Sequence, residues 1–100
     1  ILVVKTGVDS GKTYNISEGD NVIGRGADCR IQLSDDTVSR QHAVIRCRNG
    51  RMTVTNLSSA SGTRVDGRQV GGNLLQGGDV IRMGKSEVTL MAPQMQPVAV

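Results

Sequence analysis

Two arginines, a serine and the only histidine of the chain lie in one short part of the sequence, and their side chains suit the binding of an oxyanion. Arg25 follows Gly24, and Ser39, Arg40 and His42 follow after one short apolar stretch. A guanidinium donates two parallel hydrogen bonds to a phosphate, which lysine does poorly, and a serine hydroxyl adds another donor. A dianionic phosphate is therefore the ligand that best matches these residues.

Nucleophilic catalysis is the competing interpretation of the same residues. Ser39 and His42 are a hydroxyl and an imidazole three positions apart, but Ser39 does not lie in a Gly-x-Ser-x-Gly elbow. No acidic side chain that would orient His42 is evident, although Asp35 and Asp36 are near in the sequence. A single histidine also excludes a histidine-rich metal cluster. We expect a binding protein that is not an enzyme and that uses no cofactor or metal.

Two glycine-rich segments come close to nucleotide-binding motifs without matching them. GVDSGKT at 7–13 has three residues between its glycines where a phosphate-binding loop needs four, and the strand-like Tyr14 and Ile16 follow in place of a helix. GRGADC at 24–29 lacks the third glycine of the dinucleotide fingerprint. We predict a hairpin turn at 7–13.

The composition is that of one small, mildly basic domain. The chain has 100 residues and a net charge of +3, and nine of its twelve basic residues are arginine. It has one tyrosine, no other aromatic residue and no run of basic residues, so it lacks the stacking platform of single-strand binders. Although Arg46 and Arg48 give one sheet a weakly basic face, we expect no nucleic-acid partner.

The sequence contains no signal peptide and no run of about 18 apolar residues, so we expect no membrane segment. Cys29 and Cys47 lack metal-ligand spacing, and we predict that Cys47 is a buried free thiol. Nothing requires an oxidising compartment. We expect a cytoplasmic protein or the cytosolic part of a larger one, and the start at Ile1 without methionine suggests a piece of a longer chain.

Alternation of apolar and polar residues predicts ten or eleven short strands and no helix. The predicted strands are residues 1–5, 12–16, 21–25, 31–33, 42–48, 51–57, 63–65, 68–70, 73–75, 79–83 and 87–91. Asn49-Gly50 and Asp66-Gly67 predict tight hairpins. Within 42–48, Ala43 and Ile45 face one side of the strand. The pattern favours an all-β sandwich over residues 1–91, followed by a tail or linker at 92–100.

Loops at one end of a sandwich lie close together even when they are far apart in sequence. The loop that follows Arg25, the loop that carries Ser39 and Arg40, and the hydroxyl-rich segment 56–67 are candidates for such an end. We therefore expect the two guanidinium groups and the hydroxyl to converge there.

These segments together resemble the forkhead-associated (FHA) domain family. The resemblance rests on Gly24-Arg25, SRQH at 39–42 and LSSASGTRVDG at 57–67, and it covers residues 1–91, including DVIRMG before the last strand. It implies an eleven-stranded sandwich of two twisted sheets that binds phosphothreonine peptides through loops at one end and has no catalytic activity.

The resemblance also implies roles for individual residues. Arg25 would pair with the phosphate, Ser39 would donate its hydroxyl to a phosphate oxygen, and Arg40 would add a further phosphate contact. His42 would brace the binding loops rather than bind phosphate. The remaining loop-bracing residues would be Gly24, Gly62, Thr63 and Gly67.

Peptide contacts would come from Ala60, Ser61 and Asp66, and here the chain departs from the family. Ser61 stands where asparagine is usual, Ala60 where threonine or serine is frequent, and Asp66 where asparagine is also common. Serine offers one donor in place of the two donors and one acceptor of an amide. The resemblance therefore supports phosphate capture better than it supports the usual hold on the peptide backbone.

The implied partner is a phosphothreonine-containing protein or peptide in Ser/Thr kinase signalling, and the GRGADC and SRQH motifs are similar to those of bacterial members. Two alternatives stay open. In the first, the sandwich is a phosphate-independent interaction or self-association module. In the second, it binds a phosphothreonine in its own parent chain. Thr37, which follows Asp35 and Asp36, is an acid-flanked candidate phosphorylation site.

Overall fold

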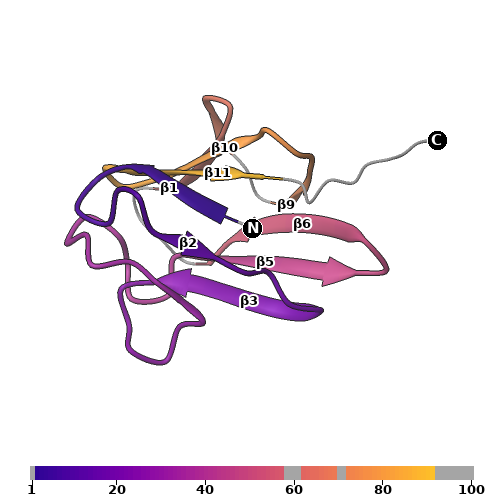
Figure 1. Ribbon diagram of the computed structural model, residues 1–100, viewed down its shortest axis with the longest axis horizontal. Coiled ribbons are helices and arrows are strands. Elements are labelled where there is room, and N and C mark those ends of the chain that lie inside the picture. Colours follow the sequence, from indigo (N-terminus) through magenta and orange to yellow (C-terminus); the bar gives the residue numbers. More distant parts are fainter. Residues whose placement is uncertain (1, 58–61, 70–71, 92–100) are drawn as a thin grey trace.

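Short alternating strands form two stacked β-sheets in the computed structural model, which describes residues 2–57, 62–69 and 72–91 (Figure 1). The strands are β1 (Leu2–Thr6), β2 (Thr13–Tyr14), β3 (Gly19–Gly24), β4 (Ile31–Gln32), β5 (Ala43–Arg48), β6 (Arg51–Asn56), β7 (Thr63–Val65), β8 (Arg68–Gln69), β9 (Gly72–Leu75), β10 (Val80–Met83) and β11 (Ser86–Leu90). In these ranges one sheet has six strands in the order β2-β1-β11-β10-β7-β8, and the other has five in the order β4-β3-β5-β6-β9. The predicted all-β sandwich is confirmed. None of the described segments forms a helix long and apolar enough to cross a membrane.

The core lies between the sheets and consists of aliphatic side chains, because the chain has almost no aromatic residues. Ala43 and Ile45 face this core, as the alternation in β5 predicts. Fully buried core residues from the two sheets include Leu2, Val4, Ile23, Ile45, Val54, Ile81, Val88 and Leu90.

Cys47 of β5 differs from its expected burial, and Val44 is buried although it lies on the outer face of the sheet. Cys47 is half-buried rather than buried, because it lies close to the Asn49-Gly50 hairpin at the end of the sheet. Val44 points to the outer face, yet only 2% of it is exposed. Its strand partners Val22 and Thr55 flank it on either side.

The hairpin turns have the backbone conformation that their sequences predict. Asn49 and Gly50 have φ of 52° and 80°, and Asp66 and Gly67 have φ of 51° and 86°. Positive φ at both central residues is the signature of a type I′ turn, which asparagine, aspartate and glycine tolerate best. Segment 7–13 is also a turn, between β1 and β2.

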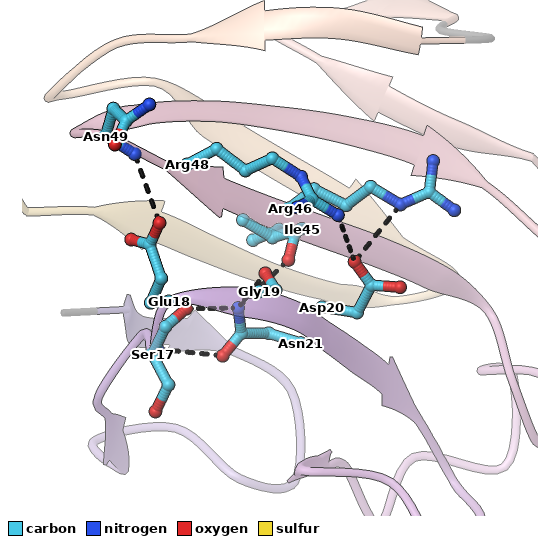
Figure 2. Close-up of polar contacts among 9 residues, drawn as sticks. All are labelled: Ser17, Glu18, Gly19, Asp20, Asn21, Ile45, Arg46, Arg48 and Asn49. Atoms are coloured by element: carbon cyan, nitrogen blue, oxygen red, sulfur yellow. Dashed lines mark hydrogen bonds and ion pairs between the residues drawn. The ribbon is translucent and has the colours of Figure 1, made fainter.

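The two ends of the five-stranded sheet differ in their polar contacts. Figure 2 shows the end where β3 begins, at which the fully buried Asn21 accepts a hydrogen bond from the N–H of Ser17 and donates to the carbonyl oxygens of Ser17 and Ile45 at 2.9–3.0 Å. The Asn21 side chain thus ties the segment before β3 to β5. At the opposite end β3 finishes at Gly24 and β5 begins at Ala43, and the loops there carry the predicted site residues.

Candidate functional site

Segments 24–26 and 39–40 lie side by side at the end of the sandwich where β3 finishes. The N–H of Arg25 donates to the carbonyl of Ser39, and the N–H of Gly26 donates to that of Arg40, both at 3.0 Å. A Cβ atom on Gly24 would lie 2.2 Å from the carbonyl oxygen of Arg40. Only a residue without a side chain permits this approach. Gly24 therefore brings the backbone of Arg25 against that of Ser39.

The side chain of Arg25 follows the backbone that leads into Ser39. Its Nε donates to the carbonyl of Val38 at 3.1 Å, and its own carbonyl accepts from the side chain of Gln32 at 3.2 Å. The guanidinium has five N–H donors, and the bond to Val38 uses one. The terminal nitrogens have no partner in the described part of the chain, so they remain able to bind an anion.

A shallow polar hollow of about 400 Å³ lies beside these segments. Its walls are Asp28, Ser39, Arg40 and Gln41, and Arg25 does not line it. The carboxylate of Asp28 accepts a long bond of 3.5 Å from Gln41. Asp28 is a wall residue that the sequence analysis did not single out, and its charge opposes that of Arg40.

His42 is fully buried and connects four segments of the chain. Its Nδ1 accepts from the N–H of Ser39 at 3.0 Å, and its Nε2 lies 2.8 Å from the carbonyl of Gly62. Its backbone N–H donates to Ile23, and its carbonyl accepts from Leu57, both at 2.8 Å. Since a backbone N–H can only donate, Nδ1 carries the lone pair and Nε2 the hydrogen. The ring holds the loops and has no free nitrogen to act as a base.

Gly62, just before β7, and Thr63, its first residue, continue this bracing. Gly62 has φ of 78°, and a Cβ atom on it would lie 2.6 Å from the side-chain nitrogen of Gln69. The hydroxyl of the buried Thr63 donates to the side-chain oxygen of Asn56 at 2.8 Å. Asn56, on β6, begins the candidate segment 56–67, but the sequence pattern assigned it no role of its own.

The predicted peptide contacts are placed only in part. Asp66 and Gly67 form the β7–β8 turn, at the far end of β7 from Gly62. Asp66 Oδ1 accepts from the N–H of Val80 at 3.0 Å, so one carboxylate oxygen serves the turn itself. Ala60 and Ser61 lie outside the described residues, as does the expected tail at 92–100.

A model of the FHA domain family matches residues 21–84, which include segments 24–26, 39–42 and 62–67. The chain belongs to the FHA domain family.

Curated relatives of this FHA domain come from Mycobacterium and Corynebacterium, and the domain matches part of each longer relative. It is 44% identical over 79 residues to the FHA domain-containing protein FhaA of Mycobacterium tuberculosis, covering 79% of this chain and 15% of FhaA. It is 35% identical over 92 residues to the oxoglutarate dehydrogenase inhibitor of Corynebacterium efficiens, covering 92% of this chain and 65% of the inhibitor. The chain thus spans less than two thirds of either relative.

Solved FHA structures are similar over almost the whole domain. One, described as "Structural and functional analysis of phosphothreonine-dependent FHA domain interactions", has a TM-score of 0.86 and 39% identity, with 97% of this chain and 96% of that chain covered. The FhaA FHA domain in complex with the intracellular domain of Rv3910 has a TM-score of 0.80 and 39% identity, with 89% and 98% covered. Mycobacterium tuberculosis EmbR in complex with a low affinity phosphopeptide has a TM-score of 0.81 and 28% identity, with 96% and 25% covered.

A buried aspartate latches the Ser39 loop of this FHA domain to the six-stranded sheet. Asp35, 6% exposed, accepts from the N–H and hydroxyl of Thr37 at 2.8 and 2.6 Å and from the hydroxyl of Ser86 at 2.7 Å. Thr37 Oγ1 in turn accepts from the N–H of Lys85 at 2.8 Å. Burial alone would raise the pKa of Asp35, but the bonds from Thr37 and Ser86 lower it below its ordinary value.

A second buried aspartate holds the start of the same loop. Asp9, 2% exposed, accepts from the N–H of Ser34 at 2.6 Å and pairs with Lys12 Nζ at 3.1 Å. Burial opposes ionisation here too, but the bonds from Ser34 and Lys12 lower the pKa of Asp9. The loop that carries Ser39 is therefore fastened by carboxylates at two points, one of which comes from the β1–β2 turn.

Sequence reasoning assigned neither aspartate to this task. Asp35 is a possible orienter of His42 and an acidic flank of Thr37 in the sequence, but in the structure its carboxylate accepts hydrogen bonds from Thr37 and Ser86. Asp35 is buried whereas its neighbour Asp36 is exposed. The local sequence does not predict which of two adjacent aspartates is buried, because that depends on where β11 packs.

Proposed function

We propose that this FHA domain binds phosphothreonine in partner proteins and holds the phosphate with Arg25, Ser39 and Arg40. The observation that carries the proposal is the pairing of segments 24–26 and 39–40, in which the N–H of Arg25 lies 3.0 Å from the carbonyl of Ser39. Two guanidinium groups and a hydroxyl arise from these neighbouring segments. The Arg25 guanidinium also donates a hydrogen bond to the carbonyl of Val38, the residue directly before Ser39.

Phosphorylation switches binding on because the phosphate supplies both the charge and the acceptors. A phosphothreonine carries about −1.5 to −2 charges at neutral pH. Each hydrogen bond to a charged group contributes roughly 1.5–3 kcal/mol, so losing two or three of them lowers affinity by orders of magnitude. Preference for threonine over serine requires burial of one methyl group, worth about 0.8 kcal/mol.

We further propose that the peptide backbone is contacted by Ala60, Ser61 and Asp66. The single hydroxyl of Ser61 in place of the usual amide predicts a weaker hold on the backbone next to the phosphothreonine. Asp66 would act through its second carboxylate oxygen, because Oδ1 already accepts from Val80.

The relatives support a partner that is itself a phosphoprotein. EmbR was solved with a phosphopeptide, and the FhaA FHA domain with an intracellular protein domain. By analogy we propose that this domain acts by binding, without catalysis, in cytoplasmic Ser/Thr kinase signalling. The phosphothreonine would lie in another protein or in the parent chain of the domain.

Titration calorimetry with phosphothreonine peptides from a degenerate library, each paired with its unphosphorylated form, tests the proposal. We expect only the phosphorylated forms to bind, and Arg25→Ala to abolish binding while the domain stays folded. Arg46→Ala is the matched control, because Arg46 is also an exposed arginine but lies on the outer face of the five-stranded sheet.

Equal affinity of Arg25→Ala and the wild type would reject the role of Arg25. Partner capture that survives phosphatase treatment of the partner would favour the phosphate-independent alternative. In that case the two arginines would have to serve a constitutive interface.

A further inference from the structure

Two arginines lie directly opposite each other on the outer face of the six-stranded sheet. Arg64 on β7 and Arg82 on β10 are register partners in the antiparallel pair, and both are exposed. Like charges placed directly across a sheet are destabilising. The fold therefore gains nothing from this pair, and the pair needs another explanation.

The pair has one carboxylate for two guanidinium groups. Arg82 Nη1 lies 3.4 Å from Glu87 Oε2 on β11, and its Nε donates to the carbonyl of Gly84 at 3.4 Å. The side chain of Arg64 has no hydrogen bond or ion pair to any described residue. Glu87 thus contacts Arg82 alone, and a further carboxylate would be needed to pair Arg64.

Both guanidinium groups border the same two hollows in the surface. The larger, of about 430 Å³, is lined by Arg64, Gly67, Val80, Arg82 and Glu87. The smaller, of about 70 Å³, is lined by Gly62, Arg64, Arg82 and Gly84. The two arginines therefore share one concave region in which an anion would contact both.

On the other sheet, two neighbouring arginines share one carboxylate, and each of them contacts it. Arg46 Nε and Arg48 Nη2 both approach Asp20 Oδ1, at 3.3 and 4.0 Å (Figure 2). Asp20 is the register partner of Arg46 on β3, so the sheet itself provides the counter-charge. No such partner stands beside Arg64 in the described residues, because its register partners are Arg82 and Gln69.

The Arg64–Arg82 pair lies within reach of the phosphate site. His42 bonds Ser39 on one side and the carbonyl of Gly62 on the other, and Arg64 follows Gly62 by two strand residues. The two hydrogen bonds of 3.0 and 2.8 Å, the imidazole between them and two residues at about 3.3 Å each make a path of roughly 15 Å, or about five residues of an extended peptide.

We propose that Arg64 and Arg82 bind an acidic side chain of the same partner segment that carries the phosphothreonine. A guanidinium donates two parallel hydrogen bonds to a carboxylate, so Arg64 fits the side chain of a glutamate or aspartate. This inference rests on the proposed phosphothreonine binding. It adds a second contact on the outer sheet face that selects among phosphorylated segments.

The test is a glutamate scan of a phosphothreonine peptide with neutral flanks that the wild-type domain binds. Glutamate is placed at successive positions on either side, and affinity is read by fluorescence anisotropy. We expect a gain of about two- to fivefold when glutamate lies roughly five residues from the phosphothreonine. Arg64→Gln should remove this gain without changing affinity for the neutral peptide, and the control Arg46→Gln should retain it. Glu87→Gln, which frees Arg82, should enlarge it.

Three results would overturn the proposal: a gain that persists in Arg64→Gln, no gain at any position, or a gain that appears only when a phosphoserine replaces the glutamate. If the neutral phosphothreonine peptides themselves fail to bind wild type, the phosphothreonine proposal fails as well. That failure is visible before any glutamate is introduced, so the two proposals are judged separately.

Discussion

The imidazole of His42 accepts a hydrogen bond from the backbone N–H of Ser39 at 3.0 Å, and this contact defines the state of the ring. Nε2 must then carry the hydrogen that is donated to Gly62 at 2.8 Å. Both ring nitrogens are used to hold loops together, so neither is available to activate the Ser39 hydroxyl. The pair that looks like a nucleophile and its base in the sequence is a brace.

Replacing His42 with alanine should therefore damage both stability and binding. The substitution opens a cavity and leaves the N–H of Ser39 and the carbonyl of Gly62 without a partner, at a cost of about 2–4 kcal/mol in the free energy of unfolding. Urea denaturation measures this cost, and Gln41→Ala, at an exposed neighbour, is the control. A change as small as that of Gln41→Ala would show that the brace is dispensable.

Gly24→Ala should separate the two site segments. The new methyl group would lie 2.2 Å from the carbonyl of Arg40, so the backbone must move and the Arg25–Ser39 bond must lengthen. We expect loss of phosphopeptide affinity by at least tenfold, since two of the proposed phosphate ligands, Arg25 and Ser39, move apart (~1.4 kcal/mol per tenfold). Gly72→Ala is the control, because a Cβ there meets only Thr55 Oγ1, at an ordinary 3.5 Å. Equal affinity of both variants would contradict the role of Gly24.

Stability should fall in acid because of Asp9 and Asp35. Both have a pKa below the ordinary value in the folded chain, so the unfolded chain binds more protons near its own pKa of about 3.9. Their contribution is fully present above that pH and is lost as the pH drops through the lowered pKa values. Urea midpoints between neutral pH and acid should show a shallower fall for Asp35→Asn than for the exposed control Asp36→Asn. Parallel curves would mean that the Asp35 latch adds nothing.

Thr37 links the Ser39 loop to the β10–β11 turn through a single hydroxyl. Thr37→Val removes the bond donated to Asp35 and the acceptor of the Lys85 N–H, which should cost about 1–2 kcal/mol in unfolding free energy and weaken phosphopeptide binding. Thr37→Glu should be more damaging, because its charge would lie beside the Asp35 carboxylate. Thr53→Val on β6 is the control. Wild-type binding by Thr37→Glu would argue that phosphorylation of Thr37 has no effect on the site.

Asp28 should lower the affinity for phosphate, because it lines the same hollow as Arg40. Asp28→Asn removes this negative charge and should tighten phosphopeptide binding about two- to fivefold at low salt, with a smaller gain at high salt because of screening. Calorimetric titrations at two salt concentrations provide the measurement. Weaker binding by the variant would instead assign Asp28 a positive role in holding the peptide.

Local patterns in the sequence determined the strands, the turns and the identity of the site segments. Alternation in β5 predicts that Ala43 and Ile45 face the core, and Asn49-Gly50 predicts its hairpin, because both depend only on residues next to one another along the chain. Gly24-Arg25 is likewise a local motif, whereas the close approach of Gly24 to the backbone of Arg40 is a finding of the structure. Such local patterns can be interpreted without knowing how the rest of the chain folds.

The stacking of the two sheets decided the contacts between distant segments. Asp9 reaches Ser34 across 25 positions and Asp35 reaches Ser86 across 51, and no local pattern encodes either contact. The juxtaposition of Arg64 and Arg82 likewise exists only because β7 pairs with β10. Side-chain hydrogen bonds and charge pairs act over a few ångströms, so they depend on which strands become neighbours, and that is settled by the packing of the whole core.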